Sequence, residues 1–112
     1  MRKLPIGLLL FCSLAVAAVD DTTARKNFGT ELAQCSAYYT AKALAPGSNQ
    51  KEHDDWQIKS NTALRAAASV TDNQFAIVAK LEAQAHPENV NGALCDQVMA
   101  HPNERFAYWR GR

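Results

Sequence analysis

Two cysteines, Cys35 and Cys95, are the feature that most constrains how this chain can fold. They are the only cysteines left once an N-terminal leader is removed, because Cys12 lies inside that leader. Two cysteines in an exported domain most simply form a disulfide. A redox-active pair usually stands close together, as in C-x-x-C, and this pair does not. The sequence therefore predicts a structural disulfide between Cys35 and Cys95.

The leader has the three parts of a secretory signal peptide. A short basic head at Arg2 and Lys3 is followed by an apolar run over residues 4–16 and by a small-residue exit. We expect residues 1–18 to be a signal peptide and residues 19–112 to form a helical domain in the periplasm or outside the cell. The alternative is that the leader is a marginal membrane anchor. That requires the apolar run to continue beyond residue 16, toward the length of about 20 residues that usually spans a bilayer.

The remaining domain is small and nearly neutral. Its length of about 94 residues indicates one domain with a modest core, burying roughly 60–65% of the unfolded surface. Removing Arg2 and Lys3 leaves ten basic against eleven acidic residues, so the formal charge moves from +1 to −1. A domain without a strong field is a poor candidate for binding nucleic acid or an anionic membrane, and we expect no membrane span after cleavage.

Residues that favour helix dominate the domain, and β-branched alternation is absent. The Pro46-Gly47 turn and the His-Pro pairs at 86–87 and 101–102 divide the helices. We predict helices over 21–44, from an N-cap at Ser48 or Asn49 to 69, from a capping box at Thr71 and Gln74 to 85, over 87–100, and over 103–109. The predicted fold is all-α: a small antiparallel bundle of four helices plus a short C-terminal helix.

Apolar spacing predicts which face of each helix is buried. A disulfide on these faces would make the first and fourth helices neighbours. The predicted core positions are Phe28, Leu32, Cys35, Tyr39 and Ala43; Trp56, Ser60, Ala63, Ala67 and Val70, widened by Ile58 and Leu64; Phe75, Val78, Leu81 and Ala85; and Val90, Leu94, Cys95 and Val98.

The C-terminal segment concentrates arginine and aromatic residues. This composition is typical of protein interfaces, and also of segments that lie on membranes, so Arg105, Tyr108, Trp109 and Arg110 are candidate partner-binding residues. The structural alternative is that Phe106 and Trp109 pack on the bundle while the arginines face water.

The three histidines are candidates for sensing pH, because histidine titrates near neutrality. They are His53, His86 and His101. A metal site is not expected: on a straight helix the two later histidines would stand about 22 Å apart. The C-x-x-C-H haem attachment motif is absent, no catalytic motif is found, and no cofactor is predicted.

The general plan of the chain is similar to that of periplasmic acid-stress chaperones and of small exported immunity proteins of Gram-negative bacteria. The similarity covers a signal peptide, about ninety mature residues, an all-helical body and one cysteine pair, with no shared motif. The leading hypothesis is a non-enzymatic protein-binding module of the interaction, inhibitor or immunity type. The alternatives are a pH-responsive periplasmic chaperone or stress protein, and a small-ligand carrier or enzyme.

Overall fold

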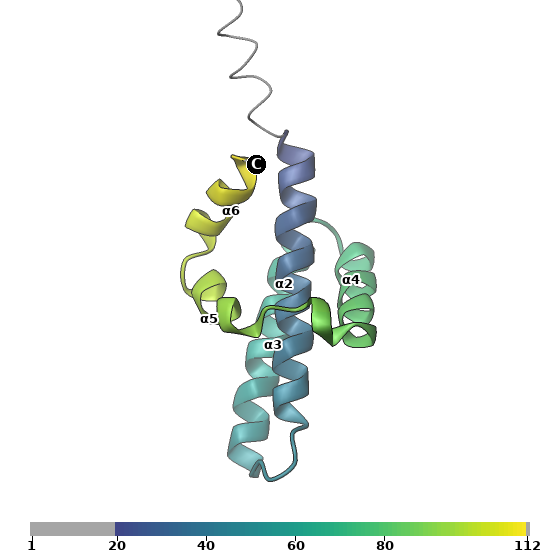
Figure 1. Cartoon of the computed structure of the whole chain (residues 1–112), viewed down its shortest axis with the longest axis vertical. Helices are drawn as coiled ribbons and strands as arrows, with labels where there is room; N and C mark the ends of the chain where they lie inside the picture. The colour runs from purple at the N-terminus through teal and green to yellow at the C-terminus, as the bar shows by residue number, and fades with distance from the viewer. Residues whose placement is uncertain (1–19, 112) are drawn as a thin grey trace, which may run out of the picture.

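The computed structural model describes residues 20–111, and the predicted signal peptide lies outside them. Within this part of the chain the secondary structure is entirely helical, so the predicted fold class is confirmed. The elements are α2 (Asp21–Ala43), α3 (Gln50–Val70), α4 (Asn73–Ala85), the short 3₁₀ helix η1 (Pro87–Asn89), α5 (Gly92–Ala100) and α6 (Pro102–Arg110). Figure 1 shows a long α2–α3 hairpin with α4 on one side and α5 and α6 on the other.

Caps and a glycine turn define the hairpin. Asp20 caps α2 by accepting a hydrogen bond from the Thr23 amide at 2.8 Å. Gly47 has a φ of +88°, a conformation that glycine adopts without strain, and it reverses the chain. Asn49, one of the two predicted caps, then forms a capping box with Glu52 at the start of α3.

Small side chains let α2 and α3 pack closely together. Ala33 on α2 and Ala63 and Ala67 on α3 are fully buried. All five predicted core residues of α2 are buried, but Ile58 on α3 is 63% exposed and does not widen the buried face as predicted. Gly29 also serves packing, because a Cβ there would contact the Thr71 side chain at 2.5 Å.

The predicted capping box before α4 is wrong. Asp72, not Thr71, is the N-cap, and it accepts from the Phe75 amide at 2.8 Å. Thr71 instead donates its hydroxyl to the Ala67 carbonyl oxygen at 2.6 Å and so ends α3. An aspartate side chain caps a helix as well as threonine does, so sequence alone does not separate the two registers.

The predicted buried face of α4 is also wrong. The helix buries Ala76 and Ala83, while Val78 and Leu81 are 56% and 59% exposed and Ala85 is exposed too. Phe75 is the one predicted residue that is partly buried. Alanines bring the α4 backbone close to the hairpin, a gain in contact that outweighs burial of its larger apolar side chains.

The predicted single helix over 87–100 is broken. It consists of η1, two non-helical residues and α5, because the chain crosses α2 at this point (Figure 1). Gly92 permits the crossing, since a Cβ there would run into the ring of Tyr38. The crossing carries the chain from the α4 side of the hairpin to the α5 side.

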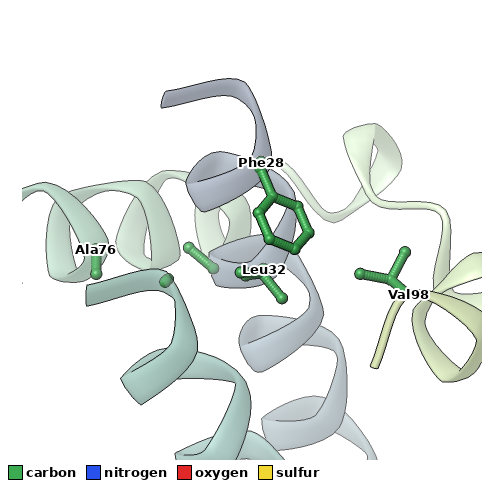
Figure 2. Packing of buried hydrophobic residues seen from close by; sticks show 6 residues of the cluster. Phe28, Leu32, Ala76 and Val98 are labelled. Atoms are coloured by element: carbon green, nitrogen blue, oxygen red, sulfur yellow. The ribbon is translucent and has the colours of Figure 1, made fainter. Parts of the chain in front are cut away.

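The core has two parts along α2. In the upper part, Phe28 and Leu32 of α2 meet Ala76 of α4 and Val98 of α5 (Figure 2). In the lower part, the predicted disulfide joins Cys35 to Cys95, with their Cα atoms 5.5 Å apart. It confirms that the first helix of the hairpin and α5 are neighbours.

Candidate functional site

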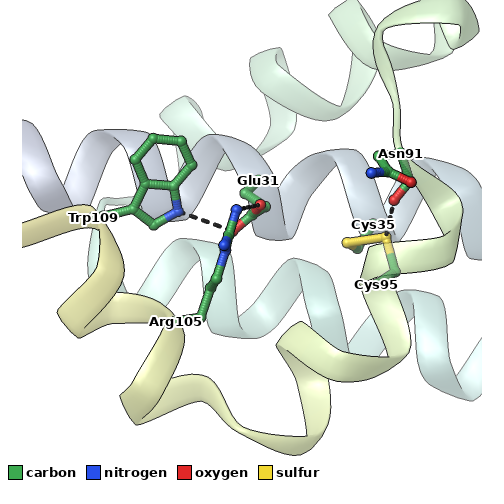
Figure 3. A network of polar contacts seen from close by, with 6 residues as sticks. All are labelled: Glu31, Cys35, Asn91, Cys95, Arg105 and Trp109. Carbon is green, nitrogen blue, oxygen red and sulfur yellow. Dashed lines mark hydrogen bonds and ion pairs between the residues drawn. A yellow bond between two sulfur atoms is a disulfide. The ribbon is translucent and has the colours of Figure 1, made fainter. Parts of the chain in front are cut away.

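A largely buried carboxylate of α2 binds two side chains of the C-terminal helix. Glu31 accepts from Arg105 Nε and Nη2, both at 2.7 Å, and from Trp109 Nε1 at 2.9 Å (Figure 3). In this ion pair the Glu31 side chain is 12% exposed and the Arg105 side chain is 19% exposed. The hydrogen bond to Glu31 is the main reason that the pKa of Arg105 is raised. We call Glu31, Arg105 and Trp109 the tail clamp.

The remaining candidates in this segment are placed differently. Phe106 packs on Phe28, with ring centroids 5.7 Å apart, as the structural alternative predicted. Arg110 faces water and reaches Asp21 at 3.2 Å. Tyr108 is 39% exposed and stacks with the Arg105 guanidinium, 3.9 Å from its ring centroid. The prediction that the arginines face water is therefore wrong for Arg105, and its partner-binding role stays a prediction.

The disulfide is a buried cross-link. Cys35 and Cys95 are 2% and 1% exposed. Cys95 Sγ lies 3.7 Å from the Asn91 carbonyl oxygen (Figure 3), but an oxidised sulfur has no proton to donate, so this is a packing contact. Its burial suits a structural bond.

The three candidate pH-sensing histidines lie at helix ends and do not converge. His53 Nδ1 contacts the Ala43 carbonyl oxygen at 2.9 Å and ties the start of α3 to the end of α2. His86 lies between Glu82 and Glu88, at 3.6 and 3.3 Å. The third, His101, lies 3.8 Å from Glu104. Their sensing role stays a prediction.

A polar network that the sequence did not reveal lies between α2, α3 and α4. Ser36 and Ser60 are fully buried and donate to each other's carbonyl oxygens at 2.8 and 2.9 Å. Thr40 Oγ1 lies 2.6 Å from Ser60 Oγ, and Lys80 Nζ donates to the same oxygen at 3.3 Å. Burial lowers the pKa of Lys80. The apolar spacing placed Ser60 on the buried face of its helix, but no sequence signal marked Ser36 or indicated which polar groups the two serines would meet.

A second polar contact joins α2 to α5. The Tyr39 hydroxyl donates to Asp96 at 2.9 Å, and its burial, followed by this bond, raises the pKa of Tyr39. Trp56 stacks on the Tyr39 ring at 5.9 Å, and Lys59 Nζ lies 4.7 Å from the Trp56 centroid. These residues fasten the lower half of the hairpin.

The outward face of α4 carries three of the exposed large apolar side chains in the described part of the chain. Ile77, Val78 and Leu81 are 49%, 56% and 59% exposed, on neighbouring positions of one helix turn. Exposed Gln74 and Ala85 extend the same face toward the two ends of the helix. We call Ile77, Val78 and Leu81 the α4 stripe.

Comparisons with protein-family models, with curated proteins and with solved structures find no match to this chain. In residues 20–111 no three His, Cys, Asp or Glu side chains gather as a metal site would require. Over the same residues, no helix is both long and apolar enough to cross a membrane.

Proposed function

We propose that this chain is an exported, non-enzymatic module that binds another protein through the α4 stripe. The observation that carries the proposal is the orientation of α4, which packs through alanines and turns three large apolar side chains outward. Contiguous exposed apolar surface on a small soluble domain is typical of an interaction site.

The stripe fits an amphipathic helix of the partner. Its residues follow one face of a 13-residue helix, which is the geometry of helix-to-helix docking through i, i+3 and i+4 anchors. Exposed Glu82 flanks the stripe on one side, so a partner helix with a basic residue at that edge would find an opposite charge. The tail clamp is a weaker candidate because Arg105 and Trp109 are already engaged with Glu31.

Export is part of the proposal. It is supported by the basic and apolar leader and by a buried disulfide, which persists in oxidising compartments. Intact mass and N-terminal sequencing of the protein from its native host test it. A chain beginning at Ala18 or Val19, without free thiols, is expected; a full-length chain with free thiols would overturn export.

The binding surface can be tested by photocrosslinking in the native host. A photoreactive phenylalanine analogue is placed at position 78 in the stripe or at position 58 on α3. Ile58 is the matched control because it is equally exposed and apolar but stands apart from the stripe. We expect a discrete adduct with a second protein from position 78, its loss when Leu81→Lys is added, and no such adduct from position 58.

Two results would contradict the proposal. One is an adduct whose mass is twice that of the chain, which would make the stripe a contact between copies. The other is equal crosslinking from positions 78 and 58, which would mean that the stripe has no preferred partner. Circular dichroism and intact mass confirm that each variant is folded and disulfide-bonded.

A further inference from the structure

A groove lies between the C-terminal half of α2 and the end of α4. Its volume is about 510 Å³, within the range of small-ligand sites. Pro87 and Val90 of the crossing segment also line it. The walls are mainly apolar, and the polar side chains Thr40 and Gln84 also line them. The apolar lining of α2 consists of Ala37, Tyr38, Ala41 and Leu44.

A partly buried lysine lies beside this groove. Lys80 Nζ cannot be more than about 6 Å from Thr40 Oγ1, because the two atoms bind Ser60 Oγ from 3.3 and 2.6 Å. Lys80 also precedes the groove residues Ala83 and Gln84 by one turn of α4, so the three share a side of that helix. The ammonium group therefore lies within about 6 Å of Thr40, which lines the groove, although Lys80 is not itself one of the lining residues.

Lys80 has no carboxylate partner within ion-pair distance in the described part of the chain. Its polar contact within residues 20–111 is the Ser60 hydroxyl, so the partial burial of its ammonium group is not offset by an opposite charge. A partly buried cation is stabilised by an anion that enters with a ligand.

We propose that the groove binds a single-chain aliphatic carboxylic acid, with the chain along the apolar wall of α2 and the carboxylate at Lys80, which has further N–H donors besides the one that Ser60 accepts. The apolar lining would take up the chain, since burial of each CH₂ group contributes about 0.8 kcal/mol. One ammonium matches one monovalent head group, whereas a phosphate dianion would leave a charge unpaired. This site is independent of the α4 stripe.

The proposal can be tested with three ligands of equal chain length and different head groups. Dodecanoate, dodecanol and dodecylammonium are titrated below their micelle concentrations into the purified, disulfide-bonded protein, and binding is followed by calorimetry at pH 7.5. We expect dodecanoate to bind at least about tenfold more tightly than dodecanol, the effect of one charge-assisted hydrogen bond. Dodecylammonium should bind no more tightly than dodecanol.

Substitutions then locate the head group and the chain. Lys80→Gln keeps a donor for Ser60 but removes the charge, and it should abolish the preference for dodecanoate while leaving dodecanol within about twofold. Lys42→Gln is the matched control, because Lys42 lies over the Tyr38 ring at 5.5 Å and is the other cation near the groove. Ala41→Phe fills the groove from an exposed helical position and should weaken all three ligands.

Each remaining result counts against the proposal. Loss of the preference in Lys42→Gln instead of Lys80→Gln would overturn the placement of the head group. If Ala41→Phe leaves the binding of all three ligands unchanged, the aliphatic chain of the ligand must lie outside the groove. Absence of dodecanoate binding by the folded wild-type protein would overturn the site itself, without bearing on the crosslinking test of the α4 stripe.

Discussion

At the scale of single residues, Glu31 determines where the C-terminal segment lies. Its carboxylate is the shared acceptor for a guanidinium and an indole that stand more than seventy positions later in the chain. Removing one partner of a buried ion pair leaves the other charge without compensation. Glu31 is therefore the residue on which the docking of α6 depends most.

We predict that Glu31→Gln destabilises the protein by about 1–3 kcal/mol, because Arg105 keeps its charge in a largely buried position. Urea unfolding followed by circular dichroism at pH 7 measures this change. Asp21→Asn is the control, since it breaks the exposed Arg110–Asp21 pair, whose side chains are 57% and 55% exposed, and should cost at most about 0.5 kcal/mol. Equal losses in the two variants would contradict a special role for Glu31.

The sequence could indicate that the tail was amphipathic but not which arginine would be buried. Phe106 was assigned to the core by its spacing from Trp109, and it packs on Phe28. Arg105 was expected in water, because neither composition nor periodicity links it to a glutamate on a distant helix. Ser60 was predicted on a buried face, but its pairing with Ser36 could not be, because the two serines meet across a helix interface.

At the scale of elements, α4 shows where hydrophobic patterning fails. The predicted face used the largest apolar residues, which is correct when burial of area dominates. In α4, Ala76 and Ala83 make the contact and Val78 and Leu81 remain outside. The five residues predicted for the face of α2 are all buried, because its large residues and its close packing fall on the same side.

We therefore expect substitutions on the two faces of α4 to differ sharply. Leu81→Lys should change the free energy of unfolding by no more than about 0.5 kcal/mol, as surface substitutions do. Ala76→Leu should cost about 1–3 kcal/mol, because it inserts volume where α4 approaches the hairpin. Urea unfolding of both variants checks this, and a large loss in Leu81→Lys with a neutral Ala76→Leu would mean that α4 packs through the predicted face.

The start of α2 should be sensitive to acid. Backbone hydrogen bonds, that from Thr23 first, lower the pKa of Asp20 from its ordinary value of 3.8. The folded state therefore takes up this proton at lower pH than the unfolded state. The cap's contribution is fully present above the ordinary value and is lost as the pH falls through the lowered pKa.

Asp20→Asn tests this, because asparagine also caps helices but does not titrate in this range. Unfolding free energies of the variant and the wild type, measured between pH 6 and pH 2.5, should converge toward the acid end. Parallel curves over that range would show that Asp20 is not coupled to folding.

At the scale of the whole molecule, the disulfide fastens the later helices to the hairpin. It was predicted from the cysteine count and the leader, and the all-helical bundle was predicted from composition. The crossing of α2 could not be predicted from the sequence, because the close approach of Gly92 to Tyr38 depends on where both helices lie.

We predict that replacing both cysteines by alanine lowers the free energy of unfolding by about 3–4 kcal/mol, the range for a loop of roughly 60 residues. Hydrogen exchange should show that α5 and α6 lose protection first, because α5 buries only Cys95 and Val98. Uniform loss of protection along the chain, with α3 opening as early as α5, would contradict this assignment.

The crossing of α2 also makes this protein intolerant of deletions at one place. Residues 86–91 must pass over a helix that is about 10–12 Å wide, and three of them are coiled into η1. Removing two residues there would force η1 to unwind if Cys95 is still to reach its partner. The 44–49 loop has no bond of this kind to satisfy. Length variation among natural versions of this chain should therefore be found in the loop at the tip of the hairpin and not in the segment that crosses α2.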